Sequence, residues 1–254
     1  MDVQVLVATM NQKDHSLLKR MNIQSDAIIG NQCNFNSIEQ FKINDCCITY
    51  LNFNERGVGL NRNNALMRAQ GKYCLFADDD MVYEDNYVDI VVSTFNDIPD
   101  ADVIIFNLKE KKPNRFVIKK ISKVNYFNYL RYGTARIAIR LKSIKDNGIY
   151  FNQCFGGGSE YCHGEDNLFL TECLNKGLNV YSVPIFIATL TEGRESSWNN
   201  GYDDKYLKDQ GKLYYTISKR WWRLLCIQDA VRHRKIYKRS VIEVLRLMFE
   251  FTDM

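Results

Sequence analysis

Short apolar runs alternate with stretches of helical composition along most of the chain. The runs are rich in valine and isoleucine and are bounded by turn residues. Strands that alternate with helices are typical of βαβ units, so the pattern predicts an α/β fold with a mostly parallel central sheet flanked by helices. We expect strands over Val3 to Thr9, Asp26 to Gly30, Cys46 to Leu51, Tyr73 to Ala77, Asp100 to Leu108, Ala135 to Leu141 and Asn179 to Ile187. In the last of these, Pro184 indicates an edge strand or a strand end.

One of the expected strands, Tyr73 to Ala77, runs directly into three acidic residues, Asp78, Asp79 and Asp80. Side chains alternate between faces along a strand, so Asp78 and Asp80 should point one way and Asp79 the other. Two carboxylates at the carboxyl end of a strand form a hard oxygen site suited to Mg²⁺ or Mn²⁺. The alternative is a solvated acidic turn.

The helix expected over residues 57–71 feeds this acidic strand. Gly57 and Gly59 stand at its start and Gly71 ends it. Arg62 on this helix either reaches a phosphate or base near the acidic cluster, or is an ordinary exposed helical arginine.

A glycine loop and two carboxylates follow in the second half of the chain. Gly156, Gly157 and Gly158 would let the backbone approach a ligand closely, unless they form only a flexible turn. Glu165 and Asp166 then open a helix that runs to Gly177. Carboxylates there either only complement the helix dipole, or include a general base, Asp166, which the dipole and backbone amides should hold ionised.

Composition narrows the class of protein. The 254 residues are 46% hydrophobic, enough to bury a core as one large domain or two packed halves. The net charge of +4 is too small to indicate a nucleic-acid partner. The eight scattered cysteines contain no Cys-x-x-Cys pair, and Cys154, Cys162 and His163 have the wrong spacing for a common zinc site.

The location of the protein follows from what the chain lacks. Met1-Asp2-Val3 opens no secretory signal, and no apolar stretch is long enough to span a bilayer. We therefore expect a cytoplasmic protein with reduced thiols.

The composition changes near residue 203. Residues 211–240 carry nine basic residues opposed only by Asp229, and Trp221 and Trp222 lie among them. We expect helices over 203–254 that either dock through 212–240 on an anionic membrane surface, at the inner face of the cell membrane, or cap the main domain.

Four blocks, in order, resemble bacterial family 2 glycosyltransferases of the polysaccharide-assembly type, which have the GT-A fold. They are VLVATMN, GVGLNRNNALMRAQGKYCLFADDD, FNQCFGGGSEYCHGEDNLFL and ESSWNNGYDDKY. The resemblance covers roughly residues 1–210. It implies a GT-A domain over 1–202, with a nucleotide-sugar half over 1–100 and an acceptor half over 101–202, followed by the helical segment 203–254.

The resemblance also implies roles for individual residues. Asp166 would be the catalytic base beside Glu165, Asp80 the more direct metal ligand and Asp78 the second. Donor-binding positions would be Ala8, Thr9, Asn11, Gln32, Arg62, Asp78, Asp79, Gly156, Gly157, Gly158 and Glu165. The chain departs from the family at two places. Asn31-Gln32 stands where the family often has an Asp that reads the base. A metal-contacting histidine near the last strand is absent, so the metal would rest on few protein ligands.

The implied activity is inverting, metal-dependent transfer of a sugar from a nucleotide-sugar, most simply a UDP-sugar, to a hydroxyl of a glycan or lipid-linked acceptor, in surface polysaccharide assembly. Mn²⁺ or Mg²⁺ would offset the diphosphate charge while Asp166 deprotonates the acceptor. Two alternatives are a sugar-phosphate nucleotidyltransferase and a non-catalytic module that binds nucleotide-sugar or membrane. The first would want a Gly- and Arg-rich loop after the first strand, where Thr9-Met10-Asn11-Gln12-Lys13 stands.

Overall fold

One ten-stranded sheet forms the centre of the molecule. The computed structural model describes residues 2–110, 116–191 and 201–250. The strand order is β3-β4-β2-β1-β5-β9-β7-β10-β6, and β8 pairs with β10. The strands are β1 (Val3–Met10), β2 (Asp26–Gln32), β3 (Ser37–Ile43), β4 (Cys46–Phe53), β5 (Tyr73–Asp78), β6 (Met81–Tyr83), β7 (Val103–Lys109), β8 (Ser122–Lys123), β9 (Ile137–Arg140) and β10 (Val180–Leu190).

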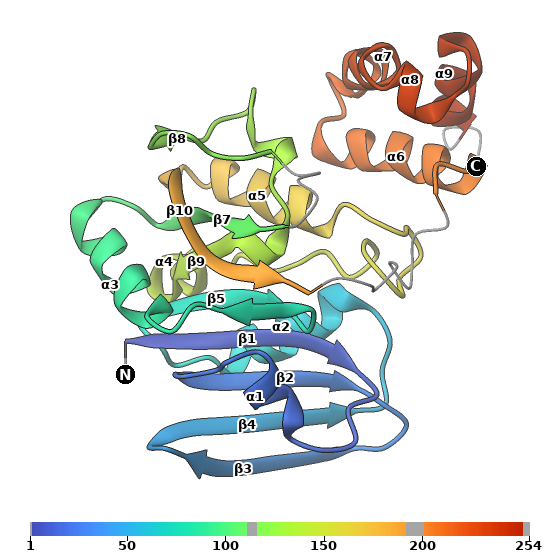
Figure 1. Cartoon of the computed structure of the whole chain (residues 1–254). Coiled ribbons are helices and arrows are strands. Elements are labelled where there is room, and N and C mark those ends of the chain that lie inside the picture. The colour runs from blue at the N-terminus through green and yellow to red at the C-terminus, as the bar shows by residue number, and fades with distance from the viewer. Residues whose placement is uncertain (1, 111–115, 192–200, 251–254) are drawn as a thin grey trace.

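Helices cover both faces of this sheet, and a separate group follows it at the C-terminus (Figure 1). The helices are α1 (Ser16–Arg20), α2 (Val58–Arg68), α3 (Tyr87–Asp97), α4 (Leu141–Asp146), α5 (Glu165–Asn175), α6 (Asp204–Ile217), α7 (Trp222–Arg232), α8 (Arg234–Tyr237) and α9 (Val241–Phe249), with 3-10 turns at Tyr129–Arg131 and Thr134–Arg136. All the helices expected from the sequence are present. Residues 195–200 of the fourth resemblance block lie outside the described residues.

The pairing of the sheet is mixed. β4, β2, β1 and β5 are parallel neighbours, as the βαβ pattern predicts. β9 lies antiparallel between β5 and β7, and β3 and β6 pair antiparallel with β4 and β10. The α/β class is therefore confirmed, while the mostly parallel pairing holds only for part of the sheet. Sequence analysis missed β3, which is largely polar and exposed, and β6, which is three residues long.

Pro184 lies in the middle of β10, not at its end, but β10 is locally an edge there, because β8 pairs with it only at Tyr181 and Ser182 and β6 only from Ala188 to Leu190. β10 pairs with β7 on one side and with β6 and β8 on the other. The register with β7 shifts between Ser182 and Phe186, and Pro184 is exposed in that irregular stretch. A bulge tolerates proline because no ladder hydrogen bond is lost there.

The alternation along β1 divides the core into two layers. Val3, Val5 and Val7 face α1 and α3, whereas Leu6 faces the layer that contains α2, α4 and α5. Both layers are almost fully excluded from solvent. The helices that carry Arg62 and Asp166 therefore lie on the same face of the sheet.

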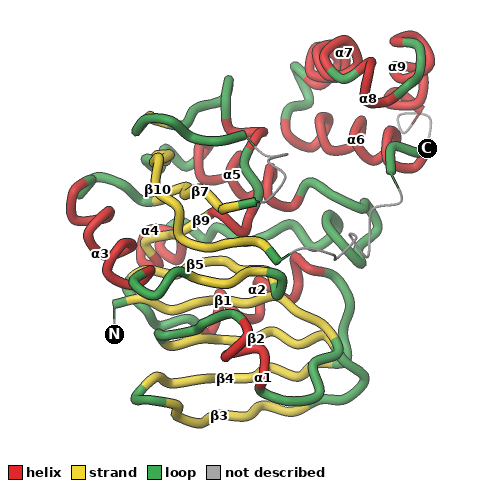
Figure 2. Tube along the Cα trace, in the orientation of Figure 1, coloured by secondary structure: helices red, strands yellow, loops and turns green. Residues whose placement is uncertain are grey.

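The helices α6 to α9 lie together beyond the sheet (Figure 2), and their apolar side chains form a hydrophobic cluster of their own. Gly211 lets α6 approach α9, since a Cβ there would collide with the carbonyl of Met248. α6 also packs on α5, with Leu213 against Gly164. In the described residues, no helix is both long and apolar enough to cross a membrane. All eight cysteines are free, as expected.

Candidate active site

The side chains of Asp78 and Asp79, at the end of β5, have hydrogen-bond partners on opposite sides of the sheet. Asp78 Oδ1 accepts a hydrogen bond from Arg62 Nη2 at 2.7 Å, on the α2 side. Asp79 Oδ2 accepts from the hydroxyl of Thr9 at 2.5 Å, at the end of β1. The alternation predicted for these two carboxylates is thus observed in their partners.

Arg62 joins the two halves of the site. Its guanidinium donates to Asp78 and also, through Nη1, to Glu165 Oε1 at 2.8 Å. The residue is only 4% exposed, so it is not the exposed helical arginine that was one of the alternatives. Its guanidinium lies over the ring of Phe151 at 5.4 Å. A planar, always charged fork suits such a double contact, which fixes the start of α5 against the end of β5.

The glycine loop packs against both helices of this cluster. The carbonyl of Gly157 accepts from the backbone N–H of Val58 at 2.9 Å. Gly156 has φ +104°, and a Cβ there would lie 2.6 Å from Val58 Cγ1 and 2.8 Å from the Glu165 carboxylate. Glycine is therefore required at position 156 by the close approach of α2 and α5.

Asp166 is half-buried at the first turn of α5, beside Glu165. Burial, together with the negative charge of Glu165, raises the pKa of Asp166 from 3.8 to about 7. The hydrogen bond from the N–H of Asn167 and the charge of Arg62 act in the opposite direction and are outweighed. The expectation that the helix terminus holds Asp166 fully ionised at neutral pH is therefore wrong, although a pKa near neutrality is well matched to a general base.

Asp80 lies in the turn after β5, where hydrogen bonds to its backbone carbonyl hold it in place. Its carbonyl accepts from the N–H and the hydroxyl of Thr191 at 2.8 and 3.0 Å. Within the described residues, Asp78, Asp79 and Asp80 do not converge as a three-ligand cluster. Arg62 already engages one oxygen of Asp78, so a cation at these carboxylates would have to take most of its ligands from a diphosphate.

The positions expected to contact the nucleoside lie at the carboxyl ends of β1 and β2. Ala8 and Thr9 are buried in β1, and Asn11 is exposed with φ +54°. Gln32 ends β2 instead of lying in a loop, and its side-chain oxygen accepts from the N–H of Gly57 at 2.9 Å. In this structure Gln32 therefore secures the start of α2.

Sequence reasoning missed three residues of this region. Gln12 donates to the hydroxyl of Thr9 at 2.8 Å and lies 3.4 Å from Asp79. Phe151 supports Arg62, and Thr191 holds the backbone of Asp80. Only Gln12 had a local signal, since it is a polar residue in the loop that follows β1.

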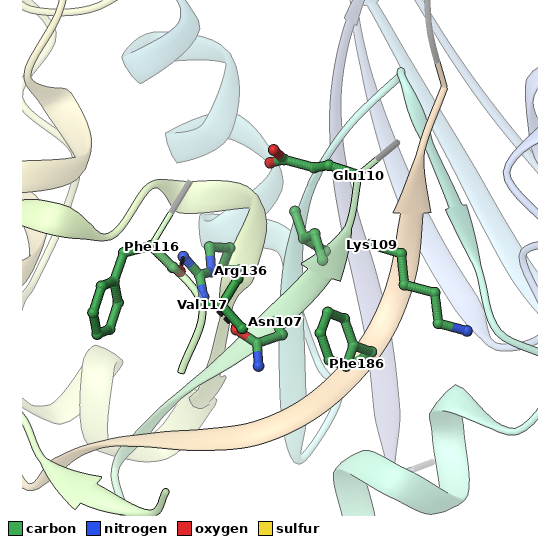
Figure 3. Close-up of a pocket in the computed structure, with 8 residues that line it drawn as sticks. Asn107, Lys109, Glu110, Phe116, Val117, Arg136 and Phe186 are labelled. Carbon is green, nitrogen blue, oxygen red and sulfur yellow. Dashed lines mark hydrogen bonds between the residues drawn. The ribbon is translucent and has the colours of Figure 1, made fainter. Parts of the chain in front are cut away.

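A separate cavity of about 200 Å³ opens near the carboxyl end of β7 (Figure 3). It mixes apolar and polar side chains, among them Asn107, Val117, Arg136 and Phe186. Arg136 is buried and donates to the carbonyls of Phe106 and Phe116 and to Asn107. β7 runs in the same direction as β5, because both pair antiparallel with β9, so this cavity lies at the same edge of the sheet as the acidic cluster.

Comparison with known proteins assigns this arrangement to a class. Residues 36–158 match the model of the glycosyl transferase family 2. A crystal structure of S. aureus TarS 1–349 in complex with UDP-GlcNAc aligns with a TM-score of 0.66 at 12% identity, covering 100% of this chain and 92% of that chain. The UDP complex of the same fragment aligns with a TM-score of 0.64 at 16% identity, covering 92% and 72%. No curated protein sequence matches the chain.

The family model supports the resemblance to family 2 glycosyltransferases over residues 36–158, and the chain shares the GT-A fold of the TarS structures. The matched region includes α2, β5 and the glycine loop, which carry Arg62, Asp78 to Asp80 and Gly156 to Gly158.

Proposed function

We propose that this protein is an inverting glycosyltransferase that moves a sugar from a UDP-sugar to a hydroxyl group of a glycan or lipid-linked acceptor, in the assembly of a bacterial surface polysaccharide. The observation that supports this most strongly is the Arg62 bridge between Asp78 and Glu165. It links the acidic strand end, where a nucleotide diphosphate would bind, to Glu165, the residue that precedes Asp166. TarS complexes with UDP-GlcNAc and UDP, which have the same fold, make uracil the first base to test.

Asp166 is the proposed catalytic base. As the acceptor hydroxyl attacks the anomeric carbon, its proton passes to the Asp166 carboxylate, and the bond from that carbon to the diphosphate oxygen breaks. Attack occurs opposite the leaving diphosphate, so one displacement inverts the configuration. Glu165 is occupied by Arg62, which leaves Asp166 as the free base of the pair.

A divalent cation, Mn²⁺ or Mg²⁺, would be held by Asp80, with Asp78 as second ligand and the donor diphosphate completing the site. It would supply charge compensation for the leaving diphosphate. Asp79 keeps the loop after β1 in place through Thr9, where the nucleoside is proposed to bind. The glycine loop would border the donor sugar.

The two halves of the chain would divide the substrates. Residues 1–100 would bind the nucleotide-sugar and residues 101–202 the acceptor, with the cavity beside β7 on the acceptor side. Residues 203–254 would form the attached helical segment.

The helical segment offers a surface for an anionic membrane at the inner face of the cell. Trp221, Leu224, Ile227 and Val231 are all more than 40% exposed along α7. The same segment, 212–240, carries the nine basic residues, and Arg220 lies over the ring of Trp221 at 4.9 Å. Apolar side chains within a basic surface favour anionic lipid. Trp222, in contrast, is buried in the core of the helices themselves.

A nucleotide-sugar panel tests the proposed function. UDP-, GDP- and dTDP-sugars would be incubated with the protein and Mn²⁺, and the released nucleotide identified. We expect UDP release that EDTA stops and that Asp80→Ala lowers roughly 100-fold while the melting temperature is kept. A nucleotidyltransferase would instead release a sugar phosphate or pyrophosphate, and a binding module would bind the donor without turnover. Full activity in EDTA would exclude the metal role.

A further inference from the structure

A cluster of three potential metal ligands lies just before α5. Cys162 Sγ, a ring nitrogen of His163 and a carboxylate oxygen of Asp209 all lie within 4.8 Å of one another. Cys162 and His163 belong to the loop that leads to Glu165, and Asp209 belongs to α6. Sequence spacing hid this cluster, because Asp209, the third member, comes 47 residues after Cys162.

We propose that Cys162, His163 and Asp209 bind a zinc ion that fastens the loop before α5 to α6. One thiolate, one imidazole and one carboxylate form a ligand set that Zn²⁺ accepts, with water in the fourth position. Neighbouring ligand atoms around tetrahedral zinc stand about 3.5 Å apart, given the usual zinc–ligand lengths. The separations are at most 4.8 Å, so none has to shorten by more than about 1.3 Å to reach that geometry.

The imidazole already has the tautomer that a metal needs. His163 Nε2 lies 2.6 Å from the side-chain oxygen of Gln210, which can only accept, so Nε2 carries the proton. His163 Nδ1 therefore directs a lone pair toward Cys162 Sγ, 3.1 Å away. A histidine whose other nitrogen donates to a carbonyl is the usual arrangement at metal sites.

The surroundings keep the ligands in place without the ion. Asp209 Oδ2 accepts from the backbone N–H of Cys162 at 2.8 Å, which ties the loop to α6. The ring of His163 stacks on Tyr206 at 4.2 Å, and burial lowers the pKa of His163, so its imidazole is neutral. Zinc is bound by the thiolate, so the Cys162 thiol releases one proton as the sulfur–zinc bond forms.

Lys205 is the competitor for this site. Its ammonium group lies 2.8 Å from Asp209 Oδ2, while its side chain is 60% exposed. A cation at that carboxylate opposes a second one by electrostatic repulsion. Removing the lysine charge should therefore tighten zinc binding. If zinc binds elsewhere, the same substitution should leave the zinc affinity unchanged.

The test is a titration of metal-free full-length protein with Zn²⁺ and, separately, with Co²⁺. We expect about one Zn²⁺ per chain and a thiolate-to-cobalt charge-transfer band. Cys162→Ser and His163→Ala should each weaken binding at least about tenfold, and Lys205→Met should strengthen it several-fold. Cys154→Ser, which removes an exposed cysteine outside the cluster, is the matched control and should bind like the wild type.

Protection of the wild-type thiol avoids dependence on variants that fold poorly. Zn²⁺ should slow alkylation of Cys162 at least about tenfold, mapped by mass spectrometry, and leave the rate at Cys154 unchanged. Absence of stoichiometric binding, or a cobalt band retained in Cys162→Ser, would overturn the proposal. Neither readout uses sugar transfer, so the outcome is independent of the proposed function.

Discussion

At the scale of single residues, Arg62 and Asp166 differ in whether a neighbouring group compensates their charge. Arg62 is buried but has two carboxylate partners, so its charge is compensated. Asp166 is half-buried beside the like charge of Glu165, which makes its ionised form costly. A charge that is expensive in the folded protein is typical of a group kept for chemistry.

The raised pKa of Asp166 predicts a stability cost at neutral pH. The folded chain keeps a proton on Asp166 up to about pH 7, whereas the unfolded chain loses it near the ordinary value of 3.8. The folded state therefore binds more protons in this window, and stability falls as pH rises through it. Asp166→Asn should raise the free energy of unfolding by about 1–3 kcal/mol at pH 8 and hardly change it near pH 3.5, as measured by urea denaturation. A variant less stable than the wild type at pH 8 would contradict the raised pKa.

At the scale of elements, the site depends on how closely α2 and α5 approach the glycine loop. Gly156 combines φ +104° with a lack of space for a Cβ beside Val58 and Glu165. Gly177 has φ +74° but open space around it, so it carries the backbone penalty alone. Substitutions at these two glycines therefore separate the free-energy cost of the backbone conformation from the cost of packing a Cβ.

We predict that Gly156→Ala lowers the free energy of unfolding by about 2–4 kcal/mol, because strain and collision add. Gly177→Ala should cost about 1–2 kcal/mol, from the backbone alone. Donor binding should weaken only in Gly156→Ala, since only this substitution displaces the start of α5. Equal losses of stability in chemical denaturation would show that the loop is not tightly packed.

The elements also show what the sequence could reveal. Periodicity predicted the strands of the parallel half and the helices that carry Arg62 and Asp166, because each is a long local pattern. It did not predict β3 and β6, whose short or polar sequences acquire strand structure only from their neighbours. Nor could it predict that Gln32 binds the backbone of Gly57, or that Asp209 meets Cys162, because these contacts join residues far apart in the chain.

At the scale of the whole molecule, the helices α6 to α9 add a basic and apolar surface to the domain that contains the sheet. The apolar side chains at positions 224 and 231 of α7 are each more than half exposed. Ile38 is comparably exposed on β3, the edge strand that begins the strand order of the sheet. The two places differ in charge, since the basic excess is confined to the C-terminal helices.

We predict that the protein binds vesicles containing phosphatidylserine and releases them as salt concentration rises. The double substitution Leu224→Ser with Val231→Ser should weaken binding at least about tenfold, because it removes apolar surface from the lipid contact. Ile38→Ser should have no effect in the same sedimentation assay. If vesicles are ignored at low salt, the helices act only as a cap.

The central claim is that Asp166 is the base of a UDP-sugar glycosyltransferase, and turnover against pH tests it most directly. UDP release from the active UDP-sugar would be followed with Mn²⁺ from about pH 5 to pH 9, for wild type and Asp166→Asn, with UDP binding measured by calorimetry. The account predicts a wild-type rate that rises to a plateau above about pH 7, and a variant slowed roughly 100-fold or more that binds UDP normally. An Asp166→Asn protein with wild-type turnover, or a wild-type rate that does not change across this range, would contradict it.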